Sequence, residues 1–348
     1  MIKFLDNIQR YFFVWIIGVM FAGLSGVYFF GGFKFSPIIC FVAALIMIYP
    51  SFVPLSFDKL TSSFGEYQII IASVVINFVV FPFLAYYIGE IFLASEPVLR
   101  LGLVILALLP GGGMVTTWAM RSKADMPTTV SIIIINLLLA IIITPFGISF
   151  FVSHFDVQSP QSTEAMCVVE KVTRGLGSCD FGGSDISPMQ MVIPMLVIVF
   201  VPLVFAYLTQ KIIISKKGET YFNDVKKIYG KFSNFGLLVI LFFLMMLRDN
   251  EIVFSNSAMI MDVILPLILF YGLGSGIILL LYKTFDDKSK GKSFIWGSYV
   301  RYITLALGIA ISIVFQDENL APIIIVISMA YFVQVPLSFL LAQYLKRD

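Results

Sequence analysis

The sequence predicts an all-α membrane protein with about ten transmembrane helices, and three observations carry that prediction. Of its 348 residues, 59% are hydrophobic and 13% are charged, whereas a soluble domain carries about 25% charged residues. The mean hydropathy is +0.97. Apolar stretches also recur along the whole chain, each near or above the ~20 residues that cross the hydrocarbon core of a bilayer as a helix.

We predict ten spans in chain order. They cover 11–30, 37–55, 67–89, 98–120, 127–153, 188–214, 232–248, 257–282, 294–315 and 320–345. No segment between them is hydrophilic and long enough to fold separately, so residues 1–348 are expected to form one transporter domain within the membrane.

The basic residues predict how the chain is oriented. With ten spans both termini lie on one side, and that side collects 17 Lys and Arg residues, against five on the other and Arg301 within a span. Cytoplasmic loops carry the excess of Lys and Arg. We therefore expect a multi-pass protein of the plasma (inner) membrane with both termini in the cytoplasm.

The longest loop, 154–187, then faces outward. It contains Cys167 and Cys179, for which a disulfide and two free thiols are both open. The loop separates 1–153 from 188–348, with five spans in each half. An odd number of spans means that the halves, if they are homologous, are inverted relative to one another.

The fourth span contains a helix break. Pro110 is followed by Gly111, Gly112 and Gly113, which cannot continue a regular helix. Backbone freed in this way is tolerated at membrane depth where protein or a water-filled cavity surrounds it. Broken helices of this kind hold the solute in many secondary transporters, although a packing kink is the alternative.

The fourth span of the second half shows a comparable interruption. It contains Gly297, Gly308, Arg301 and Thr304. Interruptions at corresponding places in two halves indicate a binding site, and the permanent charge of Arg301 suits an anionic solute. Snorkelling of Arg301 to the headgroups is the alternative. The predicted substrate-binding residues are Pro110, Gly111, Gly112, Gly113, Thr116, Arg301 and Thr304.

Three oxygen-bearing side chains are candidates for a cation site: Asn77, Thr116 and Thr129. An amide within a span either joins helices or lines the solute path. Hydroxyls in membrane helices often bond to their own backbone instead. Both readings stay open for these residues.

The catalytic motifs are absent from the sequence. There is one histidine, His154, and no HExxH, GxSxG or Walker pattern. No Cys/His cluster has the spacing of a zinc site. We expect no enzyme activity, no metal site and no cofactor.

Short motifs resemble those of the bile acid/sodium symporter superfamily, and particularly its arsenite-efflux branch. They are Met47-Ile48-Tyr49-Pro50 with Phe57-Asp58-Lys59-Leu60, Asn77-Phe78-Val79-Val80-Phe81-Pro82, and Pro110, Met114, Val115 and Trp118. Pro110-Gly111-Gly112 also resembles the bile-acid branch. The resemblance implies ten spans in two inverted five-helix repeats, with discontinuous fourth and ninth helices that cross at the substrate site.

The sequence departs from these families at the positions that carry their chemistry. Gly111 stands where the arsenite branch has its functional cysteine, and soft arsenic(III) chemistry favours a thiolate. No acidic residue occurs in 301–308, where that branch has a glutamate. Sodium-coupled members have polar residues at two groups of positions. Here those positions are occupied by Val115-Thr116 and by Ala306 with Ala310-Ile311. Sodium coupling is therefore the less favoured option.

We accordingly predict a secondary active transporter that moves a small, anionic solute by alternating access. The first alternative is an arsenite/antimonite efflux permease with a cysteine-free site. The second is a non-transporting membrane sensor on the same scaffold. The expected partners are a small-molecule solute and the lipid bilayer, with no nucleic acid, and the sequence predicts no particular oligomeric state.

Overall fold

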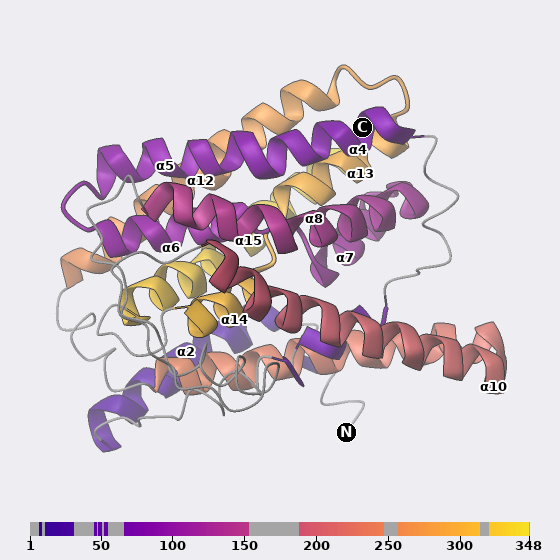
Figure 1. Ribbon diagram of the computed structural model, residues 1–348, viewed down its shortest axis with the longest axis horizontal. Coiled ribbons are helices and arrows are strands. Elements are labelled where there is room, and N and C mark those ends of the chain that lie inside the picture. Colours follow the sequence, from indigo (N-terminus) through magenta and orange to yellow (C-terminus); the bar gives the residue numbers. More distant parts are fainter. Residues whose placement is uncertain are drawn as a thin grey trace.

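The computed structural model describes residues 7–8, 11–30, 45–46, 48–50, 52–54, 66–152, 188–246, 257–313 and 320–347. Within these residues all regular structure is helical and no strand occurs. In chain order the helices are α2 (Phe12–Phe30), α4 (Tyr67–Val75), η3 (Ile76–Val80), α5 (Phe81–Phe92), α6 (Pro97–Leu108), α7 (Gly113–Arg121), α8 (Met126–Val152), α10 (Pro188–Met245), α12 (Ser257–Tyr282), α13 (Lys288–Tyr299), α14 (Ile303–Ile313) and α15 (Leu320–Arg347) (Figure 1).

Several of these helices are long and apolar enough to cross a bilayer. Among the described residues five meet both conditions: Tyr67–Phe92, Met126–Val152, Met195–Val225, Met261–Tyr282 and Pro322–Arg347. Two shorter apolar helices, Val14–Phe30 and Pro97–Leu108, accompany them. The chain is therefore a multi-pass membrane protein. The full count of ten spans and the inverted repeat stay predictions, because most of span 37–55 and all of loop 154–187, with Cys167 and Cys179, lie outside the described residues.

The third predicted span is continuous but changes its helical type in the middle. α4 passes into the π-helical turn η3 and then into α5. Pro82 lacks a backbone N–H and its ring crowds the preceding turn. The wider π-turn accommodates it, and the N–H of Phe81 donates to the carbonyl of Ile76, five residues back. Asn77 lies within this turn, and π-bulges are frequent at functional sites.

The fourth predicted span is broken where the sequence predicts the break. α6 ends at Leu108, and α7 begins at Gly113. Leu109 is extended, with ψ at 119°, as expected of a residue that precedes proline.

The ninth predicted span is also broken, between α13 and α14. The non-helical residues are Val300, Arg301 and Tyr302, so Arg301 lies in the break itself. Neither Gly297 nor Gly308, the glycines from which the sequence predicts an interruption, lies in it. Both fall inside helices.

The predicted spans 188–214 and 232–248 lie in two helices that meet at Gly218 and together carry the label α10. The basic segment between the spans, expected as a loop, is helical on both sides of Gly218, because Lys and Glu are good helix formers. The chain leaves helical geometry at Gly218, where φ is 84°, a conformation that glycine adopts readily. The stretch reverses its direction and returns along the molecule (Figure 1).

The outer surface of the helices is apolar, as a bilayer requires. On α8 the exposed side chains Leu138, Ile142, Phe146 and Phe150 recur every four residues and so form one stripe. Three of the four helices that flank the breaks, α6, α13 and α14, lie mostly inside the molecule, because residues 99–108, 291–299 and 303–310 are buried. Protein therefore surrounds the irregular backbone, which is the condition for it at membrane depth.

Candidate functional site

The two breaks lie against one another. A Cβ added to Gly111 would lie 2.8 Å from the carbonyl oxygen of Val300 and 2.4 Å from a methyl group of Val115. A Cβ on Gly112 would lie 2.5 Å from the ring of Tyr302. Only glycine permits this approach, so the Pro110-Gly-Gly sequence fits the second break. We call residues 109–112 and 300–302 together the crossing.

Arg301 is fully buried at the crossing and joins both broken helices. One terminal nitrogen of its guanidinium, Nη1, donates to the carbonyl of Ala107 at 3.1 Å and to that of Leu109 at 3.4 Å. The other, Nη2, donates to Oδ1 of Asn77 at 2.8 Å and to the carbonyl of Ser298. The side chain points inward to protein and does not snorkel to the headgroups.

Two further carbonyls beside the breaks have partners from neighbouring helices. The hydroxyl of Thr144 donates to Leu108 O at 3.3 Å, and Nδ2 of Asn77 donates to Gly297 O at 3.2 Å. Buried backbone groups without partners are costly. Protein side chains therefore satisfy several of the backbone carbonyls that the breaks set free.

Gln334 of α15 holds the backbone of Arg301 on both sides. Its Oε1 accepts from the N–H of Arg301 at 2.9 Å, and its Nε2 donates to the carbonyl of Arg301 at 3.3 Å. The hydroxyl of Tyr271 on α12 donates to the same Oε1 at 2.7 Å. This pairing substitutes for the helical hydrogen bonds that Arg301 lacks.

The positive charge of Arg301 has no carboxylate partner among the described residues. The ring of Phe81 lies 4.1 Å from the guanidinium carbon, a cation–π contact. Nε of Arg301 is buried without a hydrogen-bond partner in the part of the chain that the structure describes. The crossing therefore carries a net positive charge and an unused donor.

A polar network extends from the crossing into the neighbouring helices. Ser73 of α4 accepts from Asn77 at 3.2 Å and from Asn136 of α8 at 2.8 Å, and it bonds to the hydroxyl of Ser298 at 3.2 Å. All four side chains are fully buried. They connect α4, η3, α8 and α13 around Arg301.

The predicted site residues divide into three groups. Pro110, Gly111 and Gly112 lie in the crossing with Arg301, and Asn77 contacts Arg301 directly. Gly113 begins α7, Thr116 is half-buried one turn further along it, and Thr304 is buried in the first turn of α14. Thr129 lies elsewhere: its hydroxyl donates to Asp125 O at 2.8 Å. It precedes Asn136 by seven residues, roughly 10 Å along a helix.

Three residues in the hydrogen-bond network around the crossing are absent from the sequence-based site. They are Ser73, Tyr271 and Gln334. The amide of Gln334 inside a predicted span is a signal of the same kind as Asn77. Ser73 and Tyr271 give no such signal, because serine and tyrosine are common in membrane helices.

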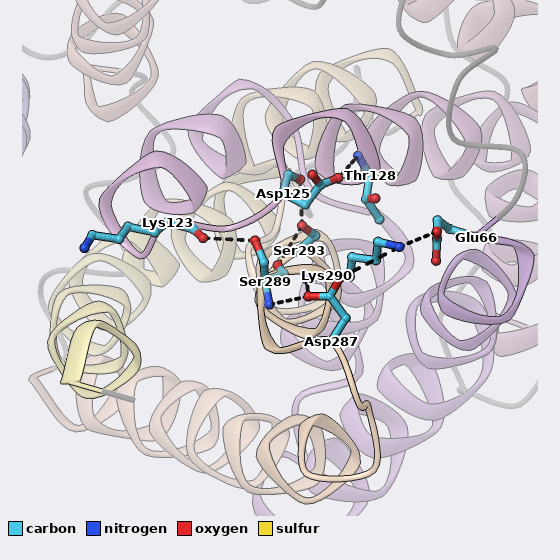
Figure 2. A network of polar contacts seen from close by, with 8 residues as sticks. All are labelled: Glu66, Lys123, Asp125, Thr128, Asp287, Ser289, Lys290 and Ser293. Carbon is cyan, nitrogen blue, oxygen red and sulfur yellow. Dashed lines mark hydrogen bonds and ion pairs between the residues drawn. The ribbon is translucent and has the colours of Figure 1, made fainter.

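A second polar group, the polar junction, lies where α13 begins. Figure 2 shows its members, which are Glu66, Lys123, Asp125, Thr128, Asp287, Ser289, Lys290 and Ser293. The N–H of Asp125 donates to Ser289 O at 3.1 Å, Oγ of Ser289 to Lys123 O at 3.2 Å, and Oγ of Ser293 to Asp125 O at 2.7 Å. These bonds tie the start of α13 to the loop between α7 and α8.

Two charged contacts complete the polar junction. Lys290 Nζ lies 2.5 Å from Oε1 of Glu66, which precedes α4, and the hydrogen bond with that carboxylate raises the pKa of Lys290 above its ordinary 10.5. Oδ2 of Asp125 accepts from the N–H of Thr128 at 2.9 Å and so caps the start of α8. The polar junction therefore ties the start of α13 to the starts of α4 and α8.

Comparison with known proteins places the chain in a family. Residues 41–255 match the sequence profile of the Sodium Bile acid symporter family. The chain is 32% identical over 146 residues to the Arsenical-resistance protein Acr3 of Corynebacterium glutamicum, which covers 39% of this chain and 38% of that protein. It is 26% identical over 241 residues to the Arsenical-resistance protein Acr3 of Alkaliphilus metalliredigens, which covers 65% of this chain and 59% of that protein.

The match to the family covers more than half of the chain, whereas the chain matches less than two thirds of the length of either relative. The family match agrees with the apolar helices in indicating a membrane protein. The chain belongs to the Sodium Bile acid symporter family.

Proposed function

We propose that the protein is a secondary active transporter that moves a small anionic solute by alternating access at the crossing. The observation that carries the proposal is the buried charge of Arg301, which has no carboxylate partner among the described residues. An ionisable residue at membrane depth is costly and usually functional. An anion bound beside Arg301 would balance its charge.

The helix ends at the crossing support an anion as well. α7 begins at Gly113 and α14 at Ile303, immediately after the two breaks. The amino end of a helix carries partial positive charge and unpaired N–H groups. Together with the unused Nε–H of Arg301, these ends offer hydrogen-bond donors to an anion.

The arrangement of the helices is compatible with alternating access. α2 packs against α10, and Figure 1 shows this pair below the helices that form the crossing. In broken-helix transporters one group of helices rocks against the other around a fixed midplane site. We propose that α2 and α10 form one such group, in an inner membrane with both termini cytoplasmic.

Arsenite or antimonite efflux through a cysteine-free site is the alternative, because both relatives are named arsenical-resistance proteins. The geometry at Gly111 disfavours a cysteine mechanism for this chain. A Cβ there would lie 2.8 Å from the backbone oxygen of Val300, so a cysteine would require the second break to move. A metalloid would instead have to bind through hydrogen bonds from its hydroxyl groups.

Flux into sealed vesicles tests the proposal. The purified full-length chain is reconstituted, and counterflow of radiolabelled organic anions, inorganic anions and arsenite is compared with protein-free vesicles. We expect counterflow of at least one anion. Flux of arsenite alone, together with metalloid tolerance conferred on a sensitive host, would replace the proposal with the alternative. Absence of flux for every solute would overturn it.

A further inference from the structure

The terminal N–H groups of Arg301 all point to one set of oxygens. The set comprises the carbonyl oxygens of Ala107, Leu109 and Ser298 and the amide oxygen Oδ1 of Asn77. Three of these are backbone carbonyls at the carboxyl ends of α6 and α13. No carboxylate belongs to the set.

Such a set has the chemistry of a site for a small monovalent cation. The carboxyl end of a helix carries partial negative charge. In broken-helix transporters, unwound carbonyls and the carboxyl ends of half-helices coordinate the coupling cation. Hard cations take oxygen ligands from carbonyls and amides. In this protein a guanidinium group fills the same place.

We propose that Arg301 is a tethered cation that permanently occupies an alkali-cation site, so that neither folding nor solute binding requires a bound sodium ion. The proposal rests on the proposed function for its statement about solute binding. The positive charge that a co-bound cation would bring to the crossing is supplied by the chain itself. Removing the side chain should leave an oxygen-lined site that accepts a small cation from solution.

The surroundings of Arg301 fit a fixed group rather than an exchangeable one. Gln334 bonds to both the N–H and the carbonyl of its backbone, and the ring of Phe81 covers one face of the guanidinium. The side chain is about 1% exposed. A group that is covalently attached and enclosed in this way does not leave during a transport cycle.

Thermal melting without solute tests the proposal directly. The purified full-length protein is melted in choline chloride, sodium chloride and dilute guanidinium chloride at equal ionic strength. Arg301→Ala is compared with the wild type. Arg100→Ala is the matched control. Arg100, on α6, is also a buried arginine, but it is ion-paired to Glu90. Arg301→Lys retains a tethered cation in case Arg301→Ala does not fold.

For the wild type, for Arg100→Ala and for Arg301→Lys, we expect the melting temperature of each protein to be the same in choline as in sodium. Arg301→Ala should melt lower and should regain about 3 °C or more in sodium or guanidinium, because a ligand of the folded state raises the melting temperature by mass action. Sodium-specific stabilisation of the wild type or of Arg301→Lys would overturn the proposal.

A folded Arg301→Ala that neither cation stabilises would also overturn it. The result is independent of the proposed function, because no solute is present in the melting experiment. Absence of solute flux in vesicles would therefore remove the proposed transport and leave the cation site standing.

Discussion

At the scale of single residues, the crossing depends on one large side chain and two absent ones. Arg301 supplies hydrogen bonds to both broken helices, and Gly111 and Gly112 leave the space in which the breaks meet. Replacing Arg301 and adding a side chain at Gly112 should each disturb the site, but by different physical effects. Loss of Arg301 leaves carbonyls without donors, whereas a side chain at Gly112 overfills the contact.

We expect Gly112→Ala to destabilise the protein by about 1–3 kcal/mol, the usual effect of overpacking. The new Cβ would lie 2.5 Å from the ring of Tyr302. That ring packs edge-on against Phe52, which is itself fully buried, so it has little room to move. Thermal melting of the purified variant measures the loss.

Gly272→Ala is the matched control for this prediction. A Cβ on Gly272, inside α12, would have no atom within 4 Å, so alanine should be neutral or stabilise the helix by up to about 1 kcal/mol. Equal melting of the two variants would show that the approach of Gly112 to Tyr302 does not limit stability.

Arg301 and its partner Asn77 could be predicted from the sequence, because a charge and an amide are unusual among the apolar residues of a membrane span. The Pro110 break follows from backbone chemistry alone. Gln334 could have been predicted in the same way, because it too is an amide within an apolar span. Tyr271 was not, because its role comes from the packing of α12 against α15, which no local pattern encodes.

At the scale of elements, each broken helix ends for its own reason. The break after α6 is local, since proline and glycine end a helix in any context. The break after α13 is tertiary. Residues 300–302 contain no glycine or proline, and the bonds from Gln334 replace those of the helix. This difference explains why the sequence located the first break within a residue or two and the second only by region.

One helix cap in the polar junction should contribute measurably to the stability of the protein. Asp125→Ala removes the carboxylate that accepts from the N–H of Thr128 at the start of α8, and we expect a loss of about 1 kcal/mol. Asp125→Asn should stay close to the wild type, because asparagine caps helices equally well. Denaturation of the three proteins in the same detergent checks this.

If Asp125→Asn lost as much stability as Asp125→Ala, the charge of Asp125 and not its capping bond would be responsible. That result would contradict the cap as the source of stability in the polar junction.

At the scale of the whole molecule, the apolar exterior and the distribution of basic residues define how the protein sits in the bilayer. The exposed stripe on α8 and the buried broken helices separate a lipid-facing surface from a polar interior. The segment of α10 around Gly218 contains six lysines between Lys211 and Lys231. Such a concentration favours the cytoplasmic side.

Labelling of cysteines in intact cells tests this orientation. After mild reduction, a membrane-impermeant maleimide should modify Cys167 and Cys179, which the prediction assigns to the outer loop, in the wild type. A cysteine introduced as Lys217→Cys, in a variant with the native cysteines replaced by serine, should be modified only after the membrane is permeabilised. Modification of that cysteine in intact cells would reverse the orientation.

Composition and periodicity were sufficient for the helical class of the fold and for the position of most spans. They did not reveal that the basic segment of α10 is helical on both sides of Gly218, because helix propensity and loop polarity oppose one another there. The contact between the fourth and ninth spans followed from the family resemblance and not from periodicity. Long-range packing of this kind has no signature in one sequence.

If the positive charge at the crossing binds an anion, neutralising that charge should abolish anion binding, and one substitution tests this. Asn77→Asp keeps the shape of the side chain that accepts from Arg301 at 2.8 Å and neutralises the charge of the site. Asn223→Asp adds the same charge at an exposed position of α10 and serves as control. All three proteins are melted against a panel of anions and arsenite.

We expect at least one anion to raise the melting temperature of the wild type and of Asn223→Asp, and to leave Asn77→Asp unchanged, because the binding free energy is lost with the charge. An equal rise for Asn77→Asp would contradict the claim. Stabilisation of all three proteins by arsenite, with no effect of any anion, would contradict it as well and would favour metalloid efflux.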